Sequence, residues 1–181
     1  HVRGFPDSSE ERLVRIAVVS AERDERERHE AQSYTRLIHD RDAEHRRYEL
    51  VYEDERMDAW ILSWMPGQGT GFHDHYISSV GLAVAAGAIR EDQMRYGMPA
   101  LERHLRPGDS RRGNASYIHR VQHWEGEPAV TVHVYSPRLD WVGQYRVDDD
   151  GVVRREPSPG RNELKDQLIA EGALGGGLER F

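Results

Sequence analysis

The chain has 181 residues, a size that suits one domain able to bury a hydrophobic core without disulfides. Its formal net charge is -7 at pH 7, and it has no basic stripe interleaved with aromatic residues, so we expect no nucleic-acid partner. The absence of cysteine excludes disulfides, thiolate ligands and a cysteine nucleophile, so any transition metal must bind to His, Asp or Glu.

The sequence also lacks the signals of membrane insertion and export. No apolar run approaches the roughly 20 residues that a membrane-spanning helix needs. The N-terminal stretch shows no charged segment followed by an apolar one. We therefore expect a cytoplasmic protein with no membrane partner, while the oligomeric state stays open.

Composition divides the chain into three stretches of a single domain. Residues 1–46 are dense in Glu and Arg with apolar positions at helical spacing, which predicts N-terminal helices packed on the next stretch. Residues 47–155 alternate short runs of Val, Ile, Tyr and Trp with Gly, Pro and Asp, which is typical of an antiparallel sandwich or barrel. Residues 156–181 predict a short helix near 162–171 and a glycine-rich tail. Examples of these runs lie at 50–52, 59–64, 80–89, 117–121, 130–135 and 142–147.

The clearest local pattern is a pair of alternating histidines in Phe72-His73-Asp74-His75-Tyr76. In a strand, alternate side chains point to the same face, so His73 and His75 can hold one metal ion while Asp74 points away. Two histidines on a wet strand face would give the same pattern, and the neighbouring sequence has to decide between these interpretations.

The neighbouring sequence favours a metal site. Gly67 stands six residues before the first histidine of the pair, and Gly87 stands twelve after the second. This spacing resembles the first sequence motif of the cupins, whose metal-binding glutamate would fall at Val80. The resemblance therefore implies a site made of histidines alone. The second cupin motif is matched in part, and its metal-binding histidine falls at His119.

A second pattern lies in the run Val130–Pro137. Thr131, His133 and Tyr135 alternate and would share one face of a strand, where they could hydrogen-bond in series. Val132 and Val134 would face the hydrophobic layer. A buried polar relay is costly unless its groups are satisfied, which favours a functional role over the exposed face of an edge strand.

Together these residues resemble the cysteine dioxygenase family of thiol dioxygenases, from about Tyr48 to Tyr145. The resemblance implies a mainly β fold, a cupin (jelly-roll) barrel with N-terminal helices and a short C-terminal helix. The matching segments, in order, are Trp64-Met65-Pro66-Gly67-Gln68, His73-Asp74-His75, Ser78, Gly87-Ala88-Ile89-Arg90-Glu91, His119-Arg120-Val121, Glu127-Pro128-Ala129-Val130 and His133-Val134-Tyr135-Ser136-Pro137.

The resemblance also implies a non-haem Fe(II) bound by His73, His75 and His119. Three neutral imidazoles leave a divalent ion with open positions, at which a substrate thiolate and O2 can bind to give a sulfinic acid. The resemblance makes Tyr135 the active-site tyrosine, supported by Thr131 and oriented by His133. It would hydrogen-bond the oxygen or the substrate carboxylate, or act as an acid or base.

The sequence departs from the family around the substrate. The family's carboxylate-binding arginine aligns with Tyr48, and Arg47 beside it would point to the other face of the strand. A bulky Tyr76 follows the histidine pair and would project near the metal. Arg138, which otherwise reads as a surface residue, could supply the missing cation. Val80 occupies the position of a cysteine that some members crosslink to the tyrosine, so this crosslink is impossible.

The sequence favours a metal-dependent thiol dioxygenase that oxidises L-cysteine or a related small thiol with O2. One alternative is a divergent three-histidine cupin that couples sulfur oxygenation to carbon–carbon or carbon–nitrogen cleavage, with Ni(II) or Co(II) in place of Fe(II). A second alternative is a non-catalytic metabolite-binding cupin, which the polar relay disfavours. The ligand set does not choose among these metals, because imidazole binds all of them.

Overall fold

The computed structural model describes residues 46–160, and the helices expected before residue 46 and near 162–171 lie outside the described residues. Eleven strands lie within this range, as predicted for a mainly β chain. Among the described residues, no helix is long and apolar enough to span a bilayer. The strands are β1 (Tyr48–Glu53), β2 (Asp58–Trp64), β3 (His73–Asp74), β4 (Ser79–Ala86), β5 (Ile89–Arg95), β6 (Met98–Leu105), β7 (Ser110–Gly113), β8 (His119–His123), β9 (Ala129–Ser136), β10 (Trp141–Val147) and β11 (Val153–Pro159).

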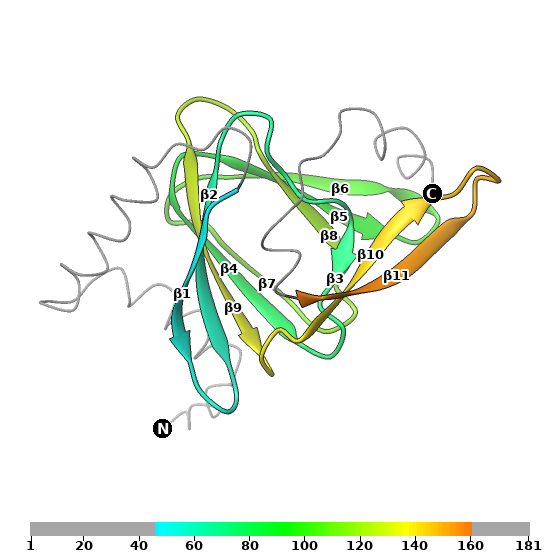
Figure 1. Ribbon diagram of the computed structural model, residues 1–181. Coiled ribbons are helices and arrows are strands. Elements are labelled where there is room, and N and C mark those ends of the chain that lie inside the picture. The colour runs from blue at the N-terminus through cyan, green and yellow to red at the C-terminus, as the bar shows by residue number, and fades with distance from the viewer. Residues whose placement is uncertain (1–45, 161–181) are drawn as a thin grey trace, which may run out of the picture.

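The strands form two antiparallel sheets that curve around a common interior (Figure 1). One sheet has the order β1-β2-β9-β4-β7, and the other has the order β11-β10-β3-β8-β5-β6. The neighbouring strands are often distant in the chain, as in the pairing of β2 with β9 and of β3 with β10. This two-sheet arrangement confirms the predicted jelly-roll type of barrel.

The hydrophobic core lies between the sheets. β2 is buried along its whole length, and Trp60, Leu62 and Trp64 belong to the main core cluster. β9 pairs with β2 on one side and with β4 on the other, so it is a central strand rather than an edge strand. The polar residues Thr131 and His133 of β9 are buried. Val132 and Val134 pack into smaller apolar clusters apart from the main core.

The predicted strand at 80–89 corresponds to β4, and its last residue begins β5. Gly87 separates them with a φ of 67°, a backbone conformation that L side chains rarely adopt. A Cβ atom at this position would lie 2.5 Å from the Cα of Ala129. Glycine is therefore required here by both the turn and the close approach of β9, and the apolar run continues across the break.

The strands β6, β7 and β11 lie outside the runs named in the sequence analysis. β6 and β11 are mostly exposed and lie at the two edges of the six-stranded sheet, and β7 lies at an edge of the five-stranded sheet. Edge strands bury few side chains, so their sequences lack the apolar alternation that identifies strands. β11 also extends to Pro159, beyond residue 155 at which we expected the barrel to end.

Candidate metal centre

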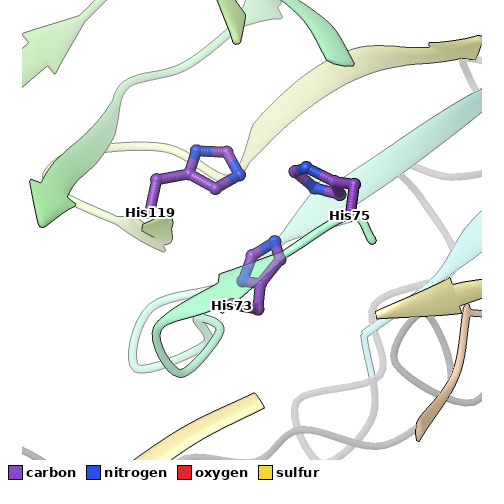
Figure 2. A group of neighbouring side chains, drawn as sticks. All are labelled: His73, His75 and His119. Atoms are coloured by element: carbon purple, nitrogen blue, oxygen red, sulfur yellow. The ribbon is translucent and has the colours of Figure 1, made fainter. Parts of the chain in front are cut away.

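Three buried histidines meet inside the barrel. His73 begins β3, His75 directly follows that strand, and His119 begins β8, where it pairs with His73 across the sheet. The ligand atoms offered by the three side chains lie within 4.8 Å of one another. Figure 2 shows the three rings pointing toward a common space. One cross-strand pair, His73 with His119, thus brings together two parts of the site that are distant in the sequence.

The nitrogen atoms of these rings fit a divalent metal ion. The Nδ1 of His73 lies 3.0 Å from the carbonyl oxygen of Gly71, which orients the ring within the cluster. The Nε2 of His119 and both ring nitrogens of His75 are buried without a hydrogen-bond partner among the described residues. Burial lowers the pKa of His75 and of His119, so both rings are neutral and carry lone pairs. Convergent imidazoles are a donor set that suits a transition metal, and two of these three are neutral with an unpaired ring nitrogen.

Asp74, between the two histidines, faces away from the cluster and anchors its strand. Its carboxylate accepts hydrogen bonds from Arg155 at 2.7 and 2.8 Å, from the Tyr145 hydroxyl at 2.7 Å and from the Tyr76 amide at 2.8 Å. Burial acts to raise the pKa of Asp74, but the hydrogen bonds from Arg155 and Tyr145 hold it below its usual value. The β10–β11 hairpin therefore holds β3 in place from outside the metal cluster.

The predicted relay forms along the inner face of β9. The indole nitrogen of Trp64 donates to the Thr131 hydroxyl at 2.8 Å, and that oxygen lies 3.0 Å from the Nε2 of His133. The Nδ1 of His133 lies 3.2 Å from the Tyr135 hydroxyl. The sequence analysis included the last three residues and missed Trp64.

The relay has a defined direction. An indole N–H can only donate, and the Thr131 hydroxyl meets no acceptor among the described residues other than His133. Thr131 therefore donates to the Nε2 of His133, which leaves the ring proton on Nδ1 to be donated to Tyr135. Burial lowers the pKa of His133 well below its usual value, which agrees with a neutral ring. The Tyr135 proton is consequently directed away from His133.

One cavity connects the metal cluster and the relay. His73, His75, His133 and Tyr135 line it together with apolar side chains. Arg46 also lines the cavity and is only 4% exposed, and its guanidinium lies 4.8 Å from the centre of a Trp64 ring. The cavity therefore combines a metal-binding cluster, a hydrogen-bond donor and a cation.

The four side chains predicted to contact substrate lie elsewhere. Arg47 and Arg138 are exposed, and Arg138 pairs with Glu53 at 3.2 Å. Tyr48 packs against the core with its ring 6.0 Å from that of Trp60. Tyr76 is 50% exposed, and the Arg155 guanidinium lies 5.4 Å from its ring. Among the described residues, the cavity lining includes Arg46 and none of these four.

Sequence reasoning missed Arg46 and Glu91, although a signal existed for each. Arg46 stands two residues before Tyr48, and strand alternation places both on the same face. Glu91 is a charged residue that the fold buries completely, and it contacts His119. A buried acidic side chain is costly without a hydrogen-bond or charge partner, and the partner here is the candidate metal ligand His119.

Two antiparallel sheets around a buried cluster of histidines define a cupin-type metal protein. The family model of cysteine dioxygenase type I matches residues 13–148. The chain therefore belongs to the cysteine dioxygenase family, as the sequence segments indicated. None of the curated proteins matches the chain.

Solved structures with a similar fold come from several bacteria. The TT1209 protein of Thermus thermophilus is 24% identical, with a TM-score of 0.50 over 58% of this chain and 94% of that one. A Klebsiella pneumoniae protein with a double-stranded β-helix domain is 22% identical, with a TM-score of 0.45 over 51% and 76%. KdgF from Halomonas sp. is 21% identical, with a TM-score of 0.46 over 52% and 82%. The likeness to the Thermus protein bears on the fold alone.

Proposed function

We propose that the protein is a thiol dioxygenase that oxidises cysteine or a related small thiol with O2 to a sulfinic acid, using Fe(II) at His73, His75 and His119. The observation that carries the proposal is the convergence of three buried imidazoles, with ligand atoms within 4.8 Å of one another, in a chain that belongs to the cysteine dioxygenase family. When bound there, the metal supplies a divalent charge that favours the thiolate form of the substrate and open positions for ligands.

Arg46 would bind the substrate carboxylate. It is the arginine whose side chain lines the cavity together with His73 and His75, and Trp64 lies against its guanidinium. A guanidinium can form two parallel hydrogen bonds to a carboxylate, which fixes the orientation of the bound molecule. We therefore assign to Arg46 the role that the sequence left to Arg47 or Arg138.

Tyr135 would act as the hydrogen-bond donor at the reacting end of the substrate. The Nδ1–H of His133 donates a hydrogen bond to the tyrosine oxygen, so the tyrosine hydroxyl donates its own proton toward another acceptor. Its ring centre lies 5.1 Å from that of His75, next to the metal cluster. A donor in this position can orient the substrate and supply or receive a proton.

Reconstitution of the metal-free protein under anaerobic conditions tests the proposal. Separate samples would receive Fe(II), Ni(II) or Co(II), then air and L-cysteine, followed by oxygen-uptake measurements and mass spectrometry of the products. We expect uptake with Fe(II) and a product heavier by two oxygen atoms. Absence of uptake with Fe(II) and a panel of small thiols would contradict the proposal.

The alternative of carbon–carbon or carbon–nitrogen cleavage with Ni(II) or Co(II) was motivated by Tyr48 and Tyr76 at positions expected in the pocket. Among the described residues, neither side chain lines the cavity. The same mass spectra distinguish this alternative, since cleavage gives fragments smaller than the substrate. A non-catalytic cupin would bind a metabolite without consuming O2 under any of these conditions.

A further inference from the structure

The three candidate ligands differ in what holds their second ring nitrogen. The Nδ1 of His73 faces a neutral backbone carbonyl at 3.0 Å. Neither nitrogen of His75 has a hydrogen-bond partner among the described residues. The Nδ1 of His119 lies 2.9 Å from a carboxylate oxygen of Glu91. His119 is therefore the ligand whose second nitrogen meets an acidic side chain.

Glu91 is buried among hydrogen-bond donors and positively charged side chains. Its side chain is 0% exposed, and the oxygen that meets His119 also accepts a hydrogen bond from the Tyr117 hydroxyl at 3.1 Å. Its other oxygen lies 3.5 Å from the Nε of Arg111 and 3.7 Å from the Nη1 of Arg103. A buried carboxylate is costly unless it is paired, and these neighbours keep it ionised.

The ionised carboxylate determines the state of His119. A carboxylate only accepts hydrogen bonds, so the Nδ1 of His119 carries the proton and the Nε2 lone pair is available to the metal. A carboxylate bound to the second nitrogen also makes an imidazole a stronger electron donor. His119 is therefore set apart from His73 and His75, although all three are chemically the same residue.

We propose that Glu91 is a positioning residue that makes His119 the most strongly donating ligand of the metal centre, an inference that rests on the proposed metal site. Val80 stands where the cupin motif carries a glutamate ligand, and it is buried in the hydrophobic core. Glu91 restores a negative charge to the site through an imidazole instead of by direct coordination. Tyr117, Arg103 and Arg111 hold this charge in place.

The test compares two neighbouring acids of β5. Glu91→Gln keeps an acceptor of the same shape and removes the charge, whereas Asp92→Asn changes an acid that is equally buried but pairs with Arg90 and Arg120. The dissociation constants for Fe(II) and Co(II) would be measured by competition with a chelator, and the reduction potential of the iron by anaerobic titration. We expect Glu91→Gln to bind either metal about 10- to 100-fold more weakly and to have a more positive potential.

Asp92→Asn should match the wild type in both measurements. A folded Glu91→Gln protein with wild-type affinity and potential would overturn the inference. If Glu91→Gln does not fold, Tyr117→Phe replaces it, because it removes one hydrogen bond to the same carboxylate. We expect smaller changes in the same directions, and wild-type values would again overturn the inference. A wild-type protein that binds neither metal would instead contradict the proposed site.

Discussion

The two sheets of the barrel contribute different chemistry to one cavity. The six-stranded sheet carries the metal cluster on β3 and β8, with Glu91 behind it on β5. The five-stranded sheet carries the relay on β2 and β9, and Arg46 stands just before its edge strand β1. The proposed metal ligands and the proposed substrate contacts therefore belong to separate hydrogen-bonded frameworks. Substitutions in one sheet should alter one property while leaving the other intact.

The largest expected effect comes from removing a ligand in the six-stranded sheet. His119→Ala should lose nearly all bound metal and all oxygen uptake, because two imidazoles cannot replace the three-ligand set. Metal analysis after dialysis measures the loss. His123→Ala is the control, since this histidine lies on the same strand and contacts the carbonyl of Glu127. Equal metal content in the two variants would place the metal elsewhere.

A substitution in the five-stranded sheet should separate catalysis from metal binding. We expect Tyr135→Phe to keep a full complement of iron but to lower kcat by about 10²- to 10⁴-fold, because a positioned proton donor is lost. Steady-state oxygen uptake and metal analysis on the same preparation provide the comparison. Tyr96→Phe, at a fully exposed tyrosine, serves as the control. An unchanged kcat in Tyr135→Phe would exclude a catalytic role for the relay.

The arginine of the cavity should affect substrate binding more than metal binding. Arg46→Met removes a buried charge that would bind the substrate carboxylate, so KM for L-cysteine should rise by about 10- to 100-fold. Arg47→Met changes the neighbouring exposed arginine and should leave KM close to that of the wild type. The opposite result, a raised KM in Arg47→Met alone, would support the original interpretation of the sequence over the structural one.

Low pH should lower the free energy of unfolding of the metal-free protein, because both sheets carry buried neutral histidines. Burial lowers the pKa of His75, His119 and His133 below the ordinary value of 6.5. The unfolded chain takes up protons near pH 6.5 while the folded chain does not. Stability is therefore full above this pH and falls below it, by about 1.4 kcal/mol per pH unit for each histidine. Urea unfolding between about pH 8 and pH 5 measures the slope. A flat profile would show that these rings are protonated in the folded state.

The smallest effect concerns the start of the relay. Trp64→Phe keeps an aromatic ring but removes the N–H that donates to Thr131, and we expect it to lower the free energy of unfolding by about 1 kcal/mol. Urea unfolding measures this change, and nitrogen-15 NMR of His133 should still report a proton on Nδ1. Trp124→Phe, at an indole stacked on His104 near the surface, provides the comparison. A proton on Nε2 in the wild type would reverse the direction assigned to the relay.

Much of this arrangement could be predicted from alternation alone. His73 and His75 share a face because side chains alternate, and the same rule aligns Thr131, His133 and Tyr135. Alternation alone did not identify which side chains line the cavity beside the histidines. Tyr76 has a φ of 58°, a left-handed backbone conformation that the sequence did not predict. It turns away from the cavity to lie beside Arg155.

The cation of the cavity escaped prediction for a different reason. The sequence analysis assigned residues 1–46 to N-terminal helices, so Arg46 was not considered together with the first strand. In the structure Arg46 stands two residues before β1 and lines the cavity. Edge strands such as β6 and β11 were missed because solvent exposure removes the constraint on their side chains.

The ion pair between Asp74 and Arg155 also has a consequence for the order of events during synthesis. The two residues are 81 positions apart, and Arg155 lies in the last strand of the described barrel. A ribosome releases His73, His75 and His119 before it releases Arg155. The candidate ligands are therefore synthesised before the residue that anchors their strand, and the ion pair can form only after β11 has been made.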